Sequence, residues 1–332
     1  MRVTVLGAGY MGSAMAEVAA MRGHEVRLWG TWLDDALVEA VEQKKDHPRL
    51  KMKLSDRIAP MRSGELARAL DGAEIVVHGV SSEGAIGVMS KAAPHLPDVP
   101  VLSVTKGFLK AKSGKMDRID VVVSETVGRP VRFVHAAGPA KAFEIARGVM
   151  TLMSFAGAPA DASLCRDVMS AEHMRIGVTD DIAGAEICSA MKNAYATGLG
   201  LFDGLVGADC HNARAACFSQ AIVEMTKLAL AGGGRPESVY GAAGVGDLHV
   251  TAAAGRNRAF GEGVGKGKPA KQVAAEMLAA GNLTEGYPAI ATAWTWAAER
   301  GVRDLPLLEA LHRIIWEEAP VASTLAALRL TV

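Results

Sequence analysis

The apolar and polar positions of the first thirty residues follow a strand–turn–helix–strand order. Residues 2–6 form a short β-branched and apolar run that ends at glycine, which predicts a buried strand. Residues 13–22 carry alanine, methionine and valine at helical spacing, and Gly23 suits the end of a helix. Residues 25–29 are a second apolar run. This order predicts a βαβ unit at the start of the chain.

Strand signals recur through the first half of the chain. Further strands are predicted for the apolar runs at residues 73–78, 99–104, 120–123, 131–136 and 149–155. Because these runs alternate with helical stretches, we expect a mostly parallel, doubly wound sheet of the Rossmann type.

The pattern changes near residue 183, after which strand signals almost vanish. Helices are predicted at residues 184–202, 209–231, 270–281, 288–300 and 306–317. A chain of 332 residues also exceeds what one core usually serves. The prediction is therefore an α/β Rossmann domain over residues 1–181, followed by an all-helical C-terminal domain over residues 182–332.

Composition narrows the expected partners and location. Lys+Arg and Asp+Glu are both 36, so we expect no basic surface for nucleic acid or anionic lipid, while a local cationic pocket for a small anion remains open. No run of 18 apolar residues exists, so no membrane span is expected. The first residues already form a strand pattern, and the four cysteines stand singly. Together these features predict a cytoplasmic protein with reduced thiols.

The turn after the first predicted strand has the sequence Gly7-Ala8-Gly9-Tyr10-Met11-Gly12. Such a glycine-rich sequence indicates a dinucleotide-binding turn only where it follows a strand and opens a helix, and both conditions are met here. Gly7 permits a tight turn, Gly9 lets the backbone approach a pyrophosphate, and Gly12 allows close helix–strand packing. The free amides of the helix start suit phosphate oxygens. We predict a nicotinamide dinucleotide as cofactor.

The choice between NAD and NADP depends on the residues after the second strand. An acid there contacts the ribose 2′-hydroxyl of NAD, whereas an arginine accommodates the 2′-phosphate of NADP. The stretch Trp29-Gly-Thr-Trp32 contains no basic residue, and the acids Asp34 and Asp35 come late. The pattern favours NAD and leaves NADP possible.

Lysine 192 stands in an otherwise small and apolar predicted helix. Burying a lysine is costly unless it is paired or functional, although a lysine that extends to the surface is the alternative. Later in the chain, Asp247 lies between glycine and leucine, and Arg256 and Arg258 flank Asn257. Such an aspartate could orient an ammonium group and such an arginine could bind a phosphate, but a solvated loop explains this segment equally well.

At these residues the chain resembles the NAD(P)-dependent glycerol-3-phosphate dehydrogenases. The resemblance runs nearly end to end, through Gly7-x-Gly9-x-x-Gly12, Thr105-Lys106-Gly107, Gly138-Pro139, Glu186 to Asn193, Asn212 to Ala216, Gly244-Val-Gly-Asp247-Leu248, Arg256-Asn257-Arg258-x-Phe-Gly261 and Thr284-Glu285-Gly286. The Lys-Asn, Gly-Asp-Leu and Arg-Asn-Arg runs are far more specific than the glycine turn.

The resemblance implies reversible hydride transfer between dihydroxyacetone phosphate and sn-glycerol 3-phosphate, and it implies roles for individual residues. The implied catalytic residues are Lys192, Asp247 and Lys106. The implied substrate-binding residues are Lys106, Asn193, Asp247, Thr251, Arg256 and Asn257. The implied cofactor-binding residues are Gly7, Gly9, Tyr10, Met11, Gly12, Trp32, Lys106, Ala140, Arg256 and Glu285. A homodimer is a further expectation from the family.

Three positions depart from the family's usual residues. Ala140 replaces a serine after Gly-Pro, Ser81 replaces the proline of a strand-end Val-Pro-Ser, and Gly255 replaces a serine before Arg-Asn-Arg. Another phosphorylated polyol or ketose therefore remains open as substrate. A 2-hydroxy or β-hydroxy acid dehydrogenase with the same layout and a non-catalytic NADH sensor are the alternatives.

Metal chemistry is not expected. The histidines are scattered without the spacing of metal ligands, and only His249, close to Asp247 and Thr251, is a candidate for the site.

Overall fold

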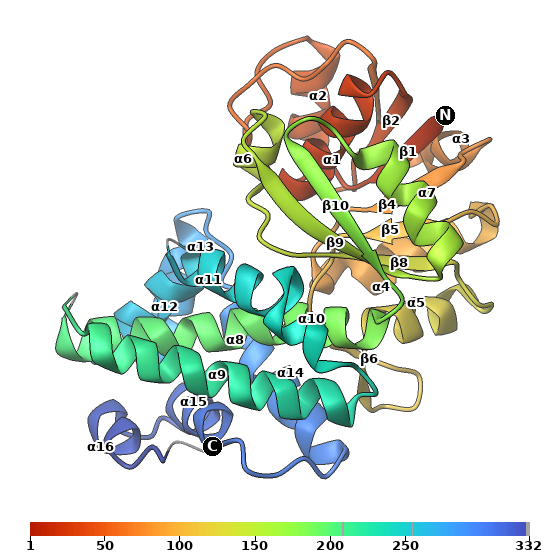
Figure 1. The fold of residues 1–332 in the computed structure, drawn as a ribbon. Coiled ribbons are helices and arrows are strands. Elements are labelled where there is room, and N and C mark those ends of the chain that lie inside the picture. Colours follow the sequence, from red (N-terminus) through yellow and green to blue (C-terminus); the bar gives the residue numbers. More distant parts are fainter. Residues whose placement is uncertain (208, 254, 330–332) are drawn as a thin grey trace. The chain divides into compact units, whose positions relative to one another are not determined.

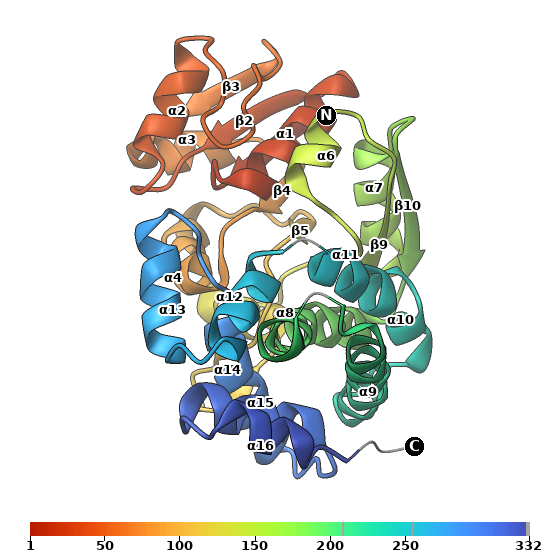
Figure 2. The ribbon, with the colours of Figure 1, turned by 90° about the vertical axis from the view of Figure 1, so that its left-hand side faces the viewer.

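The computed structural model describes residues 1–207, 209–253 and 255–329 (Figures 1 and 2). The chain divides into two compact units. The first unit comprises Met1–Lys106 and Ile119–Ile182, and the second comprises Gly107–Arg118 together with the chain from Ala183 onward. The membership of residues 107–118 in the second unit was not part of the sequence prediction, which placed one boundary between residues 181 and 182.

The first unit is built on a sheet of eight strands among the described residues. The strands are β1 (Arg2–Leu6), β2 (Glu25–Trp29), β3 (Ile58–Met61), β4 (Ile75–His78), β5 (Val101–Ser103), β8 (Phe133–Ala137), β9 (Thr151–Gly157) and β10 (Met174–Thr179). Their order in the sheet is β10-β9-β8-β5-β4-β1-β2-β3, and all neighbours are parallel except β8 and β9. The predicted mostly parallel, doubly wound sheet is confirmed.

Helices cover both faces of this sheet. They are α1 (Tyr10–Met21), α2 (Asp35–Glu42), α3 (Leu66–Leu70), α4 (Ser82–Ala92), α5 (Ile119–Val127), α6 (Ala142–Ala146) and α7 (Pro159–Met169), with 3₁₀ turns at Ser63–Glu65 and Ala93–His95. The chain moves from β1 to β2 in one direction and from β4 to β5 in the other. Right-handed crossovers therefore place α1 and α4 on opposite faces.

One predicted strand is wrong, because residues 120–123 belong to helix α5. The run of three valines suggested β structure from local propensity alone. The buried residues of α5 are Ile119, Val122 and Val123, which have the three- and four-residue spacing of one helix face. Packing of this face against the rest of the unit outweighs the β preference of its valines.

Strands β3 and β10 were not predicted, and both lie at the edges of the sheet. An edge strand needs less apolar character because one of its sides has no neighbouring strand. Pro60 stands inside β3, and β10 alternates buried, half-buried and exposed residues. Their sequences therefore lack the continuous apolar runs of the central strands.

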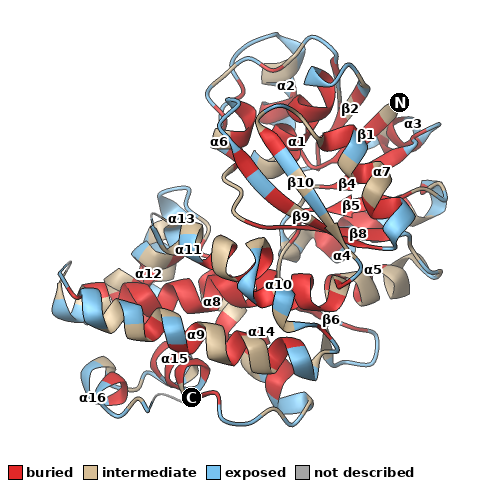
Figure 3. Ribbon diagram, viewed as in Figure 1, coloured by how far each residue is buried: buried red, intermediate tan, exposed pale blue. Residues whose placement is uncertain are grey.

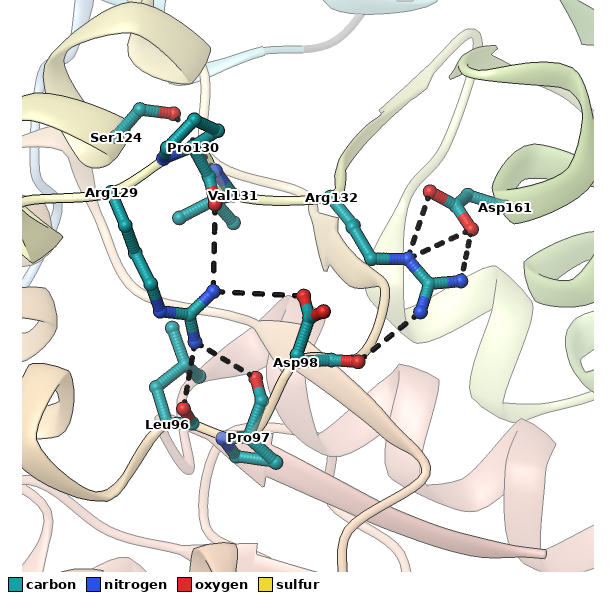
Figure 4. Close-up of polar contacts among 9 residues, drawn as sticks. All are labelled: Leu96, Pro97, Asp98, Ser124, Arg129, Pro130, Val131, Arg132 and Asp161. Carbon is teal, nitrogen blue, oxygen red and sulfur yellow. Dashed lines mark hydrogen bonds and ion pairs between the residues drawn. The ribbon is translucent and has the colours of Figure 1, made fainter.

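Two arginines fix the turn before β8 to neighbouring elements (Figure 4). Arg129 donates hydrogen bonds to the carbonyls of Leu96 and Pro97, in the segment that leads into β5. Arg132 binds the carboxylate of Asp161, on α7, through two of its guanidinium nitrogens. These bonds satisfy loop carbonyls and a largely buried carboxylate, so we assign the arginines a structural role.

The second unit is helical apart from one short hairpin among its described residues. Its helices are α8 (Ile182–Val206), α9 (His211–Ala231), α10 (Pro236–Tyr240), α11 (Asp247–Ala253), α12 (Arg256–Gly265), α13 (Ala270–Ala279), α14 (Gly286–Glu299), α15 (Pro306–Trp316) and α16 (Val321–Ala326), with a π-helical turn at Ala242–Gly246. The five predicted helices are confirmed. The segment around residues 244–258, for which a loop was equally expected, is also largely helical.

Helix α8 is the central element of the second unit. It spans 25 residues and is buried along most of its length (Figure 3). In Figures 1 and 2 helix α9 lies alongside it. Tyr195 of α8 donates a hydrogen bond to the buried carboxylate of Glu224 on α9, at 3.0 Å. That carboxylate also accepts the amides of Leu307 and Leu308, so one acid fastens the start of α15 to α8 and α9.

Glycines let α8 and α12 approach each other at backbone distance. A Cβ at Gly261 of α12 would lie 2.0 Å from the carbonyl oxygen of Thr197 on α8. A Cβ at Gly200 of α8 would lie 2.0 Å from the carbonyl oxygen of Arg258 on α12. Because the obstacles are backbone atoms, no side-chain movement can make room. These glycines set the position of α12 on α8.

We expect Gly261→Ala to destabilise the second unit by about 3 kcal/mol, the upper end of ordinary overpacking costs, since backbone must move. Urea denaturation followed by circular dichroism measures the loss. Gly64→Ala is the control, because a Cβ at Gly64 meets nothing within 4 Å. Equal stability of the two variants would contradict the packing assigned to Gly261.

The segment Gly107–Arg118 forms the hairpin of strands β6 (Leu109–Lys110) and β7 (Met116–Asp117). Phe108 stacks on Trp296 of α14, with ring centroids 4.8 Å apart. Arg300 forms an ion pair with Asp117 at 2.9 Å. These contacts explain why the hairpin belongs to the second unit.

No helix among the described residues has the length and apolar character needed to cross a membrane. All four cysteines are buried and none forms a disulfide.

Candidate active site

The glycine-rich turn lies between β1 and α1 and has the geometry that a dinucleotide requires. Gly7 has a φ of +109°, which side chains other than glycine rarely adopt. A Cβ at Gly12 would lie 2.0 Å from the carbonyl oxygen of Gly7. At Gly9 the nearest atom to such a Cβ is a guanidinium nitrogen of Arg49, 3.4 Å away. The turn thus needs glycine at two positions for its own packing, whereas at Gly9 only the end of an arginine side chain comes near.

The turn sits where the order of the sheet reverses. Strand β1 has β2 on one side and β4 on the other, so the connections leave in opposite directions. The loop after β4 touches the turn, since a Cβ at Gly79 would lie 2.8 Å from the Cα of Gly12. Open α/β sheets bind their ligands at this kind of switch point.

The other predicted cofactor residues of the first unit follow carboxyl ends of strands. Tyr10 and Met11 open α1, and Tyr10 is exposed. Trp32 follows β2 and is also exposed. Lys106 follows β5 and is half-buried, and Ala140 follows β8 and packs against the core of the unit. The sheet therefore brings these residues to its carboxyl edge.

The side chain of Asp34 is buried and hydrogen-bonded within the first unit, whereas Trp32 is exposed. Its Oδ2 atom accepts hydrogen bonds from the amide and the hydroxyl of Thr31, at 3.0 and 2.9 Å, and from the amide of Ala8 at 3.3 Å. This carboxylate braces the loop after β2 against the glycine turn. The pattern of acids after β2 consequently gives weaker support for NAD over NADP than the sequence alone indicated.

A buried histidine contacts Thr105, the residue before Lys106. His78 ends β4, and its Nδ1 atom lies 3.1 Å from the hydroxyl of Ser103 and 3.2 Å from that of Thr105. Complete burial lowers the pKa of His78 to about 4. The ring is neutral at pH 7 and holds the ends of β4 and β5 together.

This lowered pKa predicts acid sensitivity. The unfolded chain takes up the proton near the ordinary histidine pKa, and the folded chain only near pH 4, so stability is complete above about pH 6.5 and falls below it. Between pH 7 and 5 we expect His78 to account for a loss of about 2 kcal/mol. Urea denaturation of the wild type and of His78→Gln at both pH values measures it. A pH dependence unchanged by the substitution would contradict this account.

In the second unit the buried lysine is paired. Lys192 of α8 lies 2.5 Å from Oδ1 of Asp247, the first residue of α11. The lysine side chain is 10% exposed and the aspartate is fully buried. The prediction that Lys192 is buried rather than extended to the surface is therefore confirmed. The π-helical turn before Asp247 and its two glycines let the chain enter α11 with this carboxylate facing α8.

A hydrogen-bonded network begins at Asn193, the residue after Lys192 on α8. The side-chain amide of Asn193 donates to a carboxylate oxygen of Glu285 at 3.0 Å. Asn257 donates to the amide oxygen of Asn193 at 2.8 Å and accepts the backbone amide of Gly286 at 2.8 Å. Asn193, Asn257 and Glu285, predicted separately from distant segments, thus form one network beside Lys192.

Arg256 lies at the first turn of α12 and is exposed. It lines an open groove of about 410 Å³ together with Gly255, Arg258, Ala259, Glu262, Met277 and Asn282. Thr251 is half-buried on α11. His249 is exposed and packs edge-on against Phe218. The structure gives no support for His249 as a site residue.

Sequence reasoning missed the role of Asp203 on α8. Its buried carboxylate accepts the guanidinium of Arg258 at 2.5 Å and that of Arg214 at 2.9 Å. Arg258 also donates to the carbonyls of Ala252 and Ala253 at the end of α11. One arginine thereby joins α8, α11 and α12, the helices that carry Lys192, Asp247 and Arg256. An aspartate in an apolar helix was the signal that could have identified it.

One departure from the expected motif has a structural reason. Gly255 is the N-cap of α12, and a Cβ there would lie 2.2 Å from the carbonyl oxygen of Thr251. A serine does not fit this backbone. The start of α12 therefore has no side-chain cap, and its first amides stay available to a ligand. Ala140 cannot supply a hydroxyl, so the loop after β8 offers only backbone groups at that position.

Comparisons with known proteins cover nearly the whole chain. Residues 2–163 match the family model for the N-terminus of NAD-dependent glycerol-3-phosphate dehydrogenase, and residues 181–326 match the model for its C-terminus. An NADP(+)-dependent glycerol-3-phosphate dehydrogenase of Archaeoglobus fulgidus is 32% identical, over 98% of both chains. A glycerol-3-phosphate dehydrogenase [NAD(P)+] of Thiobacillus denitrificans is 34% identical, over 99% of this chain and 97% of the relative. The crystal structure of glycerol-3-phosphate dehydrogenase from Coxiella burnetii superposes with a TM-score of 0.87 at 27% identity, over 98% of each chain.

Proposed function

Because the chain belongs to the NAD-dependent glycerol-3-phosphate dehydrogenase family, we propose that it reduces dihydroxyacetone phosphate to sn-glycerol 3-phosphate, and catalyses the reverse reaction, with NADH or NADPH. The observation that carries the proposal is the buried pair of Lys192 and Asp247, with the network of Asn193, Asn257 and Glu285 beside it. The chain is an oxidoreductase that acts on a CH–OH group.

Lys192 is the proposed proton donor. When the ketone carbon is reduced, negative charge develops on its oxygen, and a nearby ammonium stabilises this charge and donates a proton to it. Asp247 holds the ammonium in one place by accepting a hydrogen bond from Nζ at 2.5 Å. Proton donation by a positioned group contributes roughly 10²–10⁴-fold to the rate. In the direction of oxidation the same amine accepts the proton.

Arg256 is the proposed phosphate-binding residue, with Asn257, Thr251 and Lys106 as further polar contacts of the substrate. A guanidinium binds a phosphate through two parallel hydrogen bonds, and the uncapped start of α12 adds amides to this position. Binding energy from the phosphate then orients the ketone carbon, which does not itself touch Arg256.

The dinucleotide is proposed to bind at the carboxyl edge of the sheet, with its pyrophosphate on the turn of Gly7, Gly9 and Gly12. The nicotinamide, when bound, supplies the hydride. Its proposed neighbours are Tyr10, Met11, Trp32, Lys106 and Ala140. The family resemblance adds Arg256 and Glu285 as cofactor-binding residues. The glycines of this turn and the start of α1, which has no side-chain cap, fit a pyrophosphate.

A substrate panel tests the function. The purified chain is assayed with NADH and NADPH against dihydroxyacetone phosphate, dihydroxyacetone, a longer ketose phosphate and a 2-keto acid. We expect dihydroxyacetone phosphate to have the highest kcat/KM, at least about 10² times that of dihydroxyacetone, because only the phosphate engages Arg256. If the 2-keto acid or the longer ketose phosphate were reduced faster, that compound would be the substrate in place of dihydroxyacetone phosphate. Cofactor binding without turnover of any ketone would contradict an enzymatic role.

A cytoplasmic location and a homodimer complete the proposal. Four buried cysteines without a disulfide support a reducing compartment. Sedimentation velocity of the purified chain, whose mass is 34.7 kDa, distinguishes a dimer from a monomer.

A further inference from the structure

The connection between α2 and β3 carries a cation to the glycine turn. Arg49, in this connection, is exposed, and its Nη1 atom lies 3.4 Å from the position that a Cβ at Gly9 would occupy. Its guanidinium carbon lies 5.5 Å from the centre of the Tyr10 ring. The guanidinium therefore covers two consecutive residues of the turn. Within the described ranges it forms no ion pair with a carboxylate.

Two buried residues hold this connection in place on either side of Arg49. The Nδ1 atom of His47 accepts the amide of Leu50 at 3.2 Å, so the proton of the neutral ring is on Nε2. This Nε2–H donates to the carbonyl of Ala8, inside the glycine turn, at 3.1 Å. Burial lowers the pKa of His47, which keeps the ring neutral and this arrangement intact. Leu50 is fully buried in the core of the unit.

His47 and Leu50 thus fix the backbone at both sides of the exposed pair Pro48 and Arg49. The hydroxyl of Ser13, in the first helical turn of α1, completes the attachment by donating to the same carbonyl of Ala8, at 3.1 Å. A loop attached in this way to the glycine turn moves with it, so the position of Arg49 over Gly9 is set by the fold. The sequence alone could not show this, because residue 49 lies forty residues beyond the turn.

We propose that Arg49 binds the bridging pyrophosphate of the dinucleotide, closing the outer side of the turn at Gly9. The proposal rests on the cofactor site assigned above. A guanidinium pairs with phosphate oxygens through two hydrogen bonds, and stacking on Tyr10 limits the freedom that its side chain loses on binding. The pyrophosphate is favoured over the 2′-phosphate of NADP because Arg49 lies at the glycine turn, whereas the adenosine ribose binds beyond the end of β2.

The test is direct binding of NADH and of NADPH to the full chain, followed by nucleotide fluorescence. Both nucleotides contain the pyrophosphate, so we expect Arg49→Met to weaken both by the same factor, about tenfold. Arg49→Lys should recover part of the lost affinity, because a lysine keeps the positive charge but cannot form the two parallel hydrogen bonds of a guanidinium. Raising the salt concentration should weaken binding less in Arg49→Met than in the wild type. A purely structural role of Arg49 would leave this salt dependence unchanged.

Lys51→Gln is the matched control, since it removes an exposed cation from the same connection, two residues away, and should leave both affinities unchanged. A loss confined to NADPH would overturn the proposal by assigning Arg49 to the 2′-phosphate. Equal affinities of Arg49→Met and the wild type would overturn it as well. A wild-type chain that binds neither nucleotide would refute the proposed function itself, and so the two failures are distinct.

Discussion

Replacing Lys192 with methionine lowers kcat for dihydroxyacetone phosphate by about 10³-fold, while the affinity for NADH changes little. The expected loss corresponds to removing both the proton donor and the charge that stabilises the developing oxyanion. Stopped-flow absorbance at the NADH band measures kcat, and nucleotide fluorescence measures binding. Because methionine leaves the carboxylate of Asp247 buried without its ammonium, a thermal melt must accompany the kinetics.

Lys192→Arg separates charge from proton transfer. The guanidinium retains a positive charge for Asp247, so this variant should fold with nearly normal stability, but it does not release its proton. We expect kcat to stay at least about 10²-fold below that of the wild type. Near-normal turnover in Lys192→Arg would show that a fixed charge suffices, and near-normal turnover in Lys192→Met would refute the assigned role of the lysine.

Replacing Arg256 with alanine lowers kcat/KM for dihydroxyacetone phosphate by about 10²-fold, as expected for the loss of two charge-assisted hydrogen bonds. With the cofactor saturating, the reduction of unphosphorylated dihydroxyacetone should change little, so the preference for the phosphorylated ketone collapses. Steady-state assays with both ketones give this ratio directly. Arg256→Lys should restore only part of the preference for the phosphorylated ketone, because an ammonium cannot form two parallel hydrogen bonds with a phosphate.

The control for Arg256 is Lys266→Ala, which removes an exposed cation just beyond the other end of α12. Its kcat/KM should equal that of the wild type. If Arg256→Ala reduced the rates with both ketones equally, the arginine would act on the fold or the cofactor and not on the substrate phosphate.

The sequence predicted most of the fold where the signal was local. Residues 2–6 and 25–29 form the expected strands, and the long helix around Lys192 is continuous as expected. Prediction failed at residues 120–123, where valines pack on one face of a helix, and at the edge strands β3 and β10. In these places tertiary packing or edge position decides the structure, and neither is visible in a short window of sequence.

The residues of the candidate site were likewise predictable only in part. Lys192 was recognisable because a charge inside an apolar helix needs an explanation, whereas the role of its partner Asp247 was implied only by the family resemblance. The contacts of Asp203 and Arg49 were not predictable, since each depends on segments far apart in the chain that meet only in the folded units. The family resemblance supplied Asn193, Asn257 and Glu285 as separate residues, and the structure joins them in one hydrogen-bonded network.

Isotope transfer tests the central claim most directly. The purified chain is incubated with dihydroxyacetone phosphate and NADH that carries two deuterium atoms at the nicotinamide C4, and the product is analysed by NMR and mass spectrometry. We predict sn-glycerol 3-phosphate with one deuterium at C2, formed in a 1:1 ratio to the oxidised cofactor. NADH oxidation without deuterium at C2, or no conversion of dihydroxyacetone phosphate while another phosphorylated ketone is reduced, would contradict the account.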